Sequence, residues 1–512
     1  NVASGAGAES FNGSYSNAGT ITQLGLTGVR HSVHGDVLHS RPVALNYGSL
    51  GVSVYYGAND GFLHAVDGNK TGATAGHELW SFIAPEHIPL LTRLRNGTPR
   101  IQLPETDSSG NTLTPPSGYA PRTYGMDGPI GVYALYSSAT TVSRAIIYPT
   151  MRRGGRTVYA FDVSSRTAPV FKWKIVGGTT TGFSRLAQTW SMPKPVVTQA
   201  ATAQAPIIIM GGGYDPAEDT NGSSDIGNRI YIINGETGML IKELPTDYSV
   251  PSDVAIVDVD GDGQPDRAYV ADVRGNLYRV DFPTSGSILD ATSWLQTSAV
   301  KIASVDGKVF FAPDVVVTRN FVAVLVGTGD REKPLLNSSS DNFVLIKDQL
   351  GSPRATPLTL SSLTRVAKID NTSMKPTQTV SGASNAAGCY IELATNGEKV
   401  VNAAFTIAGA SYFGTNRPKP AGSLSCSADL GEAYAYKFPL FCGVPQAPTP
   451  IIGGGLPPSA VGGIVTISVN GVDKQMPFLI GGTGPSTFDV SEPKPPISPA
   501  RTRQSWRIDN NR

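Results

Sequence analysis

Charged residues are scarce in this chain, and the two signs almost cancel. Asp, Glu, Lys and Arg make up 16% of its 512 residues, and the formal net charge is +1. A chain so nearly neutral has no strong positive field with which to displace counterions, which argues against nucleic acid as a general partner. No apolar run approaches the roughly 20 residues that a membrane-spanning helix needs. We therefore expect no membrane span in this chain.

Cysteine is rarer still, with three residues in the whole sequence. Cys426 and Cys442 are near one another in the sequence, so we predict that they form a disulfide and that Cys389 is left over. The alternative is three buried thiols. Catalysis by cysteine is not expected, because there is no C-x-x-C motif and no His in a nearby motif.

Glycine and proline are abundant, with 57 and 38 residues. This composition is typical of many short strands joined by turns, and it predicts an all-β protein. The sequence begins at Asn1 without a methionine and shows no signal peptide. We expect it to be an excised piece or a mature form.

The most informative segment is an acidic loop at residues 258–266, which follows the pattern D-x-D-x-D-G-x-x-D. Spacing by two turns successive carboxylates toward the inside of a curled loop, and Gly263 permits the sharp bend. Six to eight hard oxygen ligands suit Ca²⁺. The predicted ligands are three alternating carboxylates, one backbone carbonyl and a closing carboxylate: Asp258, Asp260, Asp262, Gln264 and Asp266.

This loop differs from an EF-hand. An EF-hand has a bidentate Glu at position 12 of its loop, where this chain has Tyr269. The flanking residues alternate with the period of strands, not helices. We therefore predict a calcium loop on a β-hairpin. The alternative is an acidic turn that binds nothing, although its four carboxylates would then repel one another.

A second pattern is a recurring unit of about 50 residues, in which hydrophobic strands alternate with turns and a Tyr-x-x-Asp sequence recurs. The Asp60-Gly61 pair of the first unit is a strong hairpin signal. Such a period is typical of β-propeller blades, which bury their faces only by packing on one another. The alternative is a β-sandwich. The predicted units cover residues 52–82, 145–175, 207–241, 253–281, 315–348, 399–438 and 463–481.

Two long insertions interrupt the repeat, at residues 96–120 and 335–387. We predict a lead-in segment over residues 1–34 and a single modified propeller domain over residues 35–512. Its closing segment is expected at residues 501–512, around Trp506.

An ordered series of motifs resembles the C-terminal propeller domain of the PilY family of type IV pilus biogenesis factors and tip adhesins. The series comprises residues 35–43, 56–65, 153–160, 212–215, 236–238, 258–276 and 505–507. The resemblance implies a propeller of seven blades and a calcium role for the five ligand residues at 258–266.

The same resemblance implies a function. Such proteins are exported through the periplasm and lie at the cell surface, at the pilus tip or on the outer membrane. They support pilus extension by opposing retraction in a calcium-dependent way, and some attach to surfaces. The implied partners are minor pilins and other pilus components, and host or abiotic surfaces. No catalytic residue is expected.

The rival interpretation is an enzyme. The pattern of residues 57–67 also resembles propellers that bind pyrroloquinoline quinone and oxidise alcohols. Those enzymes usually carry adjacent cysteines, and this chain has no such pair.

Two further clusters are interpreted as structural. His31, His34 and His39 lie near Asp36, but their spacing does not place them on one face, so we predict packed or hydrogen-bonded side chains and no metal. Three arginines, at positions 152, 153 and 156, are expected at a solvated hairpin tip.

Overall fold

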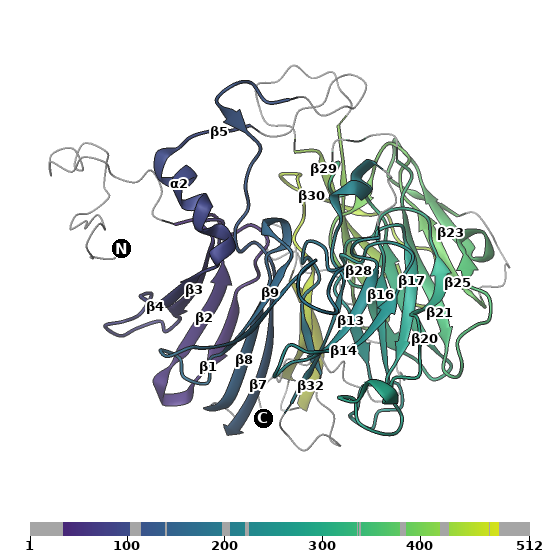
Figure 1. Cartoon of the computed structure of the whole chain (residues 1–512). Coiled ribbons are helices and arrows are strands. Elements are labelled where there is room, and N and C mark those ends of the chain that lie inside the picture. Colours follow the sequence, from purple (N-terminus) through teal and green to yellow (C-terminus); the bar gives the residue numbers. More distant parts are fainter. Residues whose placement is uncertain are drawn as a thin grey trace. The chain divides into compact units, whose positions relative to one another are not determined.

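The computed structural model describes residues 34–102, 114–138, 141–196, 205–220, 225–334, 336, 339–378, 386–419, 430–469 and 472–480 (Figure 1). The chain divides into two compact units. The first contains the residues up to 130 with 134–155 and 162–170, and the second contains 131–133, 156–161 and the residues from 171 onward. Among the described residues, no helix has the length and apolar character needed to cross a membrane.

The chain opens with two four-stranded sheets. The first has the order β1-β2-β3-β4, with β1 Val43–Asn46, β2 Val52–Gly57, β3 Phe62–Asp67 and β4 Glu78–Ile83. The second has the order β10-β9-β8-β7, with β7 Ile130–Ser138, β8 Thr141–Pro149, β9 Thr157–Asp162 and β10 Val170–Val176.

The next two sheets follow the same plan. One has the order β11-β12-β13-β14, with β11 Lys194–Val196, β12 Ile207–Gly211, β13 Arg229–Asn234 and β14 Leu240–Pro245. The other is β15-β16-β17-β18-β22, with β15 Ala255–Val257, β16 Arg267–Ala271, β17 Asn276–Asp281, β18 Val300–Ser304 and β22 Leu358–Thr359.

The C-terminal half adds two larger sheets. One has the order β19-β20-β21-β25-β23-β24, with β19 Asp314–Val317, β20 Phe321–Gly327, β21 Asn342–Gln349, β23 Thr364–Ile369, β24 Pro376–Gln378 and β25 Gly388–Glu392. The other has the order β26-β28-β29-β30 with β27 also paired to β28, and comprises β26 Lys399–Val400, β27 Phe405–Ile407, β28 Ala410–Arg417, β29 Glu432–Pro439 and β30 Thr449–Ile451.

Two small sheets and a few short helices complete the described chain. The hairpin of β31 Val461–Val469 and β32 Val472–Ile480 forms one small sheet, and β5 Arg100–Ile101 with β6 Tyr119–Ala120 forms the other. The single α-helix described is α2, Ile88–Asn96. The 3₁₀ turns are η1 Gly48–Leu50, η2 Pro85–His87, η3 Arg152–Gly154, η4 Pro216–Thr220, η5 Ala291–Ser293 and η6 Leu360–Ser362.

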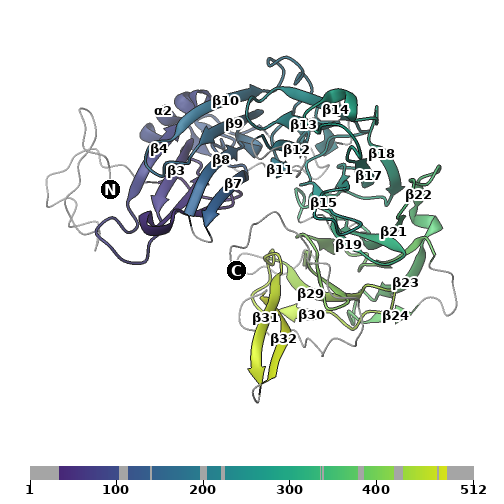
Figure 2. The same ribbon diagram turned by 90° about the horizontal axis from the view of Figure 1, so that it is seen from below.

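The sheets of the second unit succeed one another in chain order and pack face to face (Figure 2). Ile209 of β12 shares a hydrophobic cluster with Val270 of β16. Phe343 of β21 stacks on Phe413 of β28, with ring centroids 3.9 Å apart. Because both faces of each inner sheet are covered, β12 and β16 are buried along their whole length. Packing of this kind confirms the predicted all-β propeller architecture.

Several details of the predicted blades are confirmed. The first repeat unit forms β2, β3 and β4, and the predicted Asp60-Gly61 turn joins β2 to β3, with Gly61 at φ +93°. The number of seven blades and the single-domain boundaries stay predictions. The predicted closing segment 501–512, with Trp506, lies outside the described residues.

The two predicted insertions contribute strands. Within 96–120, β5 pairs with β6 in parallel. Within 335–387, β21 is a core strand, β22 extends the preceding sheet beside β18, and β23 pairs in parallel with β25. The second insertion is therefore built into two neighbouring sheets and is more than a surface excursion.

The predicted disulfide between Cys426 and Cys442 is wrong. Cys442 is bonded to Cys389, with the two Cα atoms 5.9 Å apart. Cys389 lies in β25 and Cys442 follows β29, so the bond joins two neighbouring sheets. Their packing brings together residues separated by 53 positions, and closeness in sequence could not reveal this. Cys426 lies outside the described residues.

Candidate metal centre

The acidic loop joins β15 to β16, which pair antiparallel with Val257 opposite Arg267. The backbone of Asp266 closes the hairpin. Its N–H donates to the carbonyl of Val257 at 3.0 Å, and its own carbonyl accepts from Phe282 at 2.8 Å. The predicted position of the loop on a β-hairpin is confirmed by these contacts.

Three carboxylates converge within the loop. Asp258, Asp260 and Asp262 each offer an oxygen, and the three oxygens lie within 4.8 Å of one another. Two ligands of one Ca²⁺, at bond lengths of roughly 2.3–2.6 Å, lie at most about 5 Å apart. The donor set of three carboxylates therefore fits a calcium ion in both chemistry and spacing.

The loop backbone holds this convergence in place. Asp258 accepts hydrogen bonds from the N–H groups of Gly261 at 2.6 Å and of Gly263 at 2.9 Å. The two glycines have φ values of +82° and +88°, which a residue with a side chain rarely adopts. Asp262 N–H donates to Asp260 Oδ1 at 3.0 Å. Hydrogen bonds from backbone N–H groups within the loop thus hold these carboxylates close to one another.

Asp266 and Gln264 occupy different places from these three. Asp266 is not a member of the converging group, and its Oδ2 accepts from the N–H groups of Val259 at 2.6 Å and Asp260 at 3.3 Å. Gln264 donates its N–H to Asp262 Oδ1 at 2.7 Å. The predicted roles of the Asp266 carboxylate and the Gln264 carbonyl as metal ligands stay predictions.

The electrostatics of the loop favour a bound cation. Among the described residues, no Lys or Arg forms an ion pair with Asp258, Asp260 or Asp262. Burial raises the pKa of Asp266, and the nearby carboxylates of Asp260 and Asp258 raise it further, against the lowering effect of the Val259 N–H. Concentrated negative charge of this kind is stabilised by a divalent ion.

The strand after the loop is fastened to the neighbouring sheet. Arg267 donates to the carbonyl of Gln349 at 2.8 Å, and Tyr269 donates to Asp348 Oδ2 at 2.7 Å. Arg279 of β17 donates to the carbonyl of Gly351 at 2.9 Å. The residues directly after the loop therefore contact the end of β21 and the segment that follows it.

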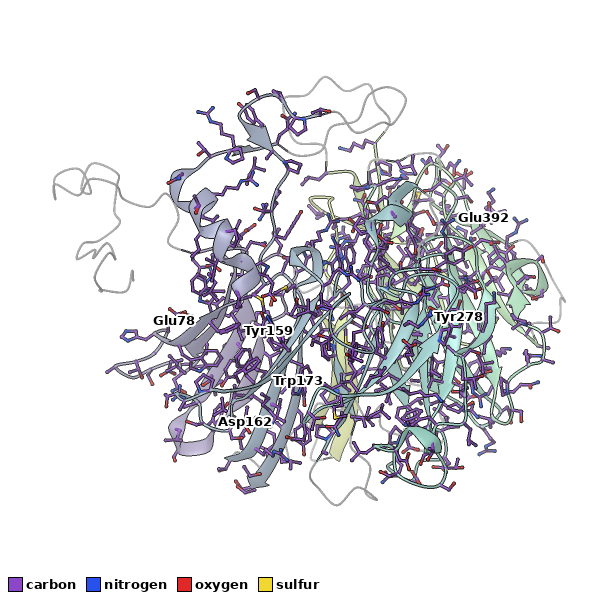
Figure 3. The ribbon with its side chains drawn as sticks, in the orientation of Figure 1. Glu78, Tyr159, Asp162, Trp173, Tyr278 and Glu392 are labelled. Carbon is purple, nitrogen blue, oxygen red and sulfur yellow. A yellow bond between two sulfur atoms is a disulfide. The ribbon has the colours of Figure 1, made fainter. Side chains whose placement is uncertain are left out.

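At its other end, β16 is joined to β17 by a buried polar turn that was not predicted from the sequence. Asp272 accepts from the amide of Asn276 at 2.8 Å and from the hydroxyl of Tyr278 at 2.9 Å. Tyr278 lies on β17 (Figure 3). The Asp-x-x-Gly-Asn sequence at 272–276 was the available signal, since Gly275 has a φ of +82°. These contacts fix the turn between β16 and β17.

The family model of the PilY1 beta-propeller domain matches residues 43–314, which include the acidic loop. The chain belongs to the PilY1 beta-propeller family. The resemblance stated from the sequence motifs is confirmed.

Individual relatives carry the same family name. The type IV pilus biogenesis factor PilY1 of Pseudomonas aeruginosa is 25% identical over 282 residues, which cover 49% of this chain and 21% of that protein. A PilY1 homolog of Xylella fastidiosa is 25% identical over 292 residues, covering 54% of this chain and 17% of that protein. The chain thus matches about a fifth of the length of these curated relatives.

The fold also matches a solved structure. The crystal structure of the Pseudomonas aeruginosa PilY1 C-terminal domain aligns with a TM-score of 0.56 and 18% identity, over 84% of this chain and 91% of that one. This likeness supports the propeller fold.

Proposed function

We propose that this chain is the calcium-binding C-terminal domain of a type IV pilus biogenesis factor and pilus-tip adhesin. In this proposal it supports pilus extension by opposing retraction when calcium is bound. Family membership and the naming of the relatives as type IV pilus biogenesis factors support the pilus role. The convergence of Asp258, Asp260 and Asp262 within 4.8 Å is the observation that carries the calcium role.

The ion would act by stiffening one end of two neighbouring sheets. With calcium bound, the repulsion among the three carboxylates is neutralised and the loop is held in one conformation. Arg267 follows the loop and contacts the carbonyl of Gln349, so the order of the loop extends to the end of β21. A pilus component or a surface that docks on this end meets a fixed, less negative face.

The proposal places the protein outside the cytoplasm and assigns it no catalysis. The buried Cys389–Cys442 disulfide suits an oxidising compartment, such as the periplasm or the cell surface. Minor pilins and other pilus-tip components are the proposed partners, together with a host or abiotic surface. A quinone-dependent enzyme is the alternative. We expect that adding the protein to pyrroloquinoline quinone will leave the spectrum of the quinone unchanged.

The experiment uses the full-length protein in a bacterium that lacks its own copy. Cells are complemented with wild type, Asp258→Asn, Asp262→Asn or the control Asp290→Asn, which changes an acidic residue outside the loop. We expect the two loop variants to reduce the number of surface pili and to remove the effect of calcium on twitching, with the control unchanged. Disabling the retraction motor should restore pili to the loop variants.

Two results would argue against the proposal. Normal pili and normal calcium dependence in both loop variants would make the loop a structural feature only. Pili that stay absent after retraction is disabled would assign the protein to assembly and not to opposition of retraction.

A further inference from the structure

A second group of metal-ligating side chains lies in the first sheet, far along the sequence from the acidic loop. His34, Asp60 and His64 each offer one ligand atom, and the three atoms lie within 4.8 Å of one another. His64 belongs to β3 and Asp60 to the turn before it, whereas His34 belongs to the segment that precedes β1. We propose that these three residues bind a divalent transition metal of the zinc class.

The pair of Asp60 and His64 already has the spacing of two ligands on one ion. Asp60 Oδ2 lies 3.3 Å from His64 Nε2. Zinc bonds to nitrogen and oxygen of about 2.0–2.2 Å place neighbouring ligands of a tetrahedron about 3.3–3.5 Å apart. A metal between these two atoms would replace their direct contact with little movement of either side chain.

The other ring nitrogen of His64 has the partner that metal-binding histidines have. His64 Nδ1 lies 2.7 Å from Glu78 Oε1. Glu78 is the first residue of β4, beside β3 in the sheet (Figure 3). A carboxylate that accepts the Nδ1 proton directs the Nε2 lone pair toward a metal and raises its basicity. Glu78 is therefore a positioning residue in this site.

The carboxylate of Asp60 is held as firmly as the ring. Its Oδ2 accepts from the N–H of Gly35 at 2.9 Å, and its Oδ1 accepts from the N–H of Phe62 at 3.0 Å. Asp60 and His64 are both buried, with 6% and 8% of their surfaces exposed. Both ligands are therefore fixed before any metal arrives.

Gly35 explains how His34 reaches the site. A Cβ atom at position 35 would lie 2.2 Å from the backbone nitrogen of Asp60. Only glycine allows the chain at position 35 to approach the β2–β3 turn so closely. The approach is continued by Asp36, whose carbonyl accepts from Asn59 N–H at 3.0 Å.

His34 is the adjustable ligand. Its ring is exposed and stacks on the ring of His64, with centroids 4.6 Å apart, and its Nε2 lies 3.0 Å from the hydroxyl of Tyr56. Because the side chain is exposed, its ring can turn to bring a nitrogen onto a metal shared with the other two. Imidazole and carboxylate together suit zinc better than the all-oxygen loop does.

This assignment changes the interpretation of the N-terminal histidines. The sequence spacing predicts no metal at His31, His34 and His39. His39 lies 2.7 Å from Asp127 Oδ2, as a hydrogen-bonded residue should, and His31 lies outside the described residues. His34 instead lies near Asp60 and His64, which the pairing of β2 with β3 brings together. The spacing of His34 from His31 and His39 in the sequence did not indicate this contact.

The metal would clamp residues 34–36 to the first sheet. The Gly35 N–H donates to the Asp60 carboxylate, and the Asn59 N–H donates to the Asp36 carbonyl. A zinc ion shared by His34 and the β2–β3 hairpin would add a bond that chelators can remove. This role is separate from the proposed calcium loop and does not depend on it.

The test is a calorimetric titration of the whole chain with zinc chloride, with calcium at saturation so that the acidic loop is filled. We expect one zinc per chain in the wild type, and a zinc-dependent rise in melting temperature. His34→Ala and Asp60→Asn should each lower zinc affinity at least tenfold, and Glu78→Gln by about 10–100-fold.

Two controls keep the test specific. His77→Ala removes an exposed histidine of the same unit that is not part of the group, and Asp262→Asn alters the acidic loop; both should bind zinc as the wild type does. His34 is exposed, so His34→Ala should melt like wild type without zinc. No zinc uptake by the wild type, or unchanged uptake by both His34→Ala and Asp60→Asn, would overturn the proposal and leave an ion-paired His64 in its place.

Discussion

Arg279 and Asp348 form a buried ion pair between two neighbouring sheets, with Arg279 Nη1 3.1 Å from Asp348 Oδ2. Both residues are almost fully buried, at 3% and 2% exposure. Tyr269 donates to the same carboxylate oxygen at 2.7 Å. One carboxylate of β21 therefore fastens both strands that follow the acidic loop.

We predict that Asp348→Asn destabilises the protein by about 3–5 kcal/mol, because it removes the buried carboxylate that pairs with both Arg279 and Arg267. Asp281→Asn is the matched control. Asp281 also contacts Arg279, at 2.6 Å, but its side chain is 34% exposed, so its removal should cost about 1 kcal/mol or less. Chemical denaturation of both variants measures the difference. Equal losses would show that the buried pair contributes no more than the exposed one.

The disulfide provides a second prediction with an internal control. Cys442→Ser removes the bond to Cys389, which closes a loop of 53 positions, and should lower stability by about 4 kcal/mol under oxidising conditions. Cys426→Ser should leave the melting curve unchanged. A loss in Cys426→Ser as large as the loss in Cys442→Ser would restore the pairing first predicted from the sequence.

Glu398 makes stability depend on pH. Burial raises its pKa above the ordinary 4.5, although hydrogen bonds from Thr415, the Ala394 N–H and Tyr436 lower it. A carboxyl group whose pKa is raised on folding binds its proton more tightly in the folded state. Its contribution to stability is therefore greatest below pH 4.5 and is lost as the pH rises through the folded pKa.

Glu398→Gln removes this titration. We expect the stability of the wild type relative to Glu398→Gln to fall as the pH rises from below 4.5 toward neutrality. Denaturation at a series of pH values measures the difference between the two proteins. A difference that is constant across the series would show that Glu398 has the same pKa in the folded and unfolded chains.

Features set by neighbouring residues could be predicted from the sequence. The Asp60-Gly61 turn and the convergence of Asp258, Asp260 and Asp262 both follow from local spacing, and the structure places them on hairpins as expected. The alternation of hydrophobic strands and turns likewise predicted the propeller, because each blade is built from consecutive strands.

Features set by packing between distant segments could not be predicted. The partner of Cys442 depends on which sheets are neighbours. Strand β22 joins the sheet of β18 although β19, β20 and β21 of the next sheet lie between them in the chain. The meeting of His34 with His64 requires residues 34–36 to lie on the β2–β3 turn. Asp266 was predicted as a closing ligand from its position, whereas its contacts with Val259 and Asp260 depend on how the loop curls.

The most direct test of the account is a calcium titration of the purified chain by calorimetry. We predict one bound ion for the wild type and for the control Asp290→Asn, in which Asn can still accept the hydrogen bond from Thr292 N–H. Asp258→Asn and Asp262→Asn should each lose measurable calcium binding, because each removes one charged ligand of a small site. Wild-type affinity in both loop variants, or no calcium bound by the wild type, would contradict the account.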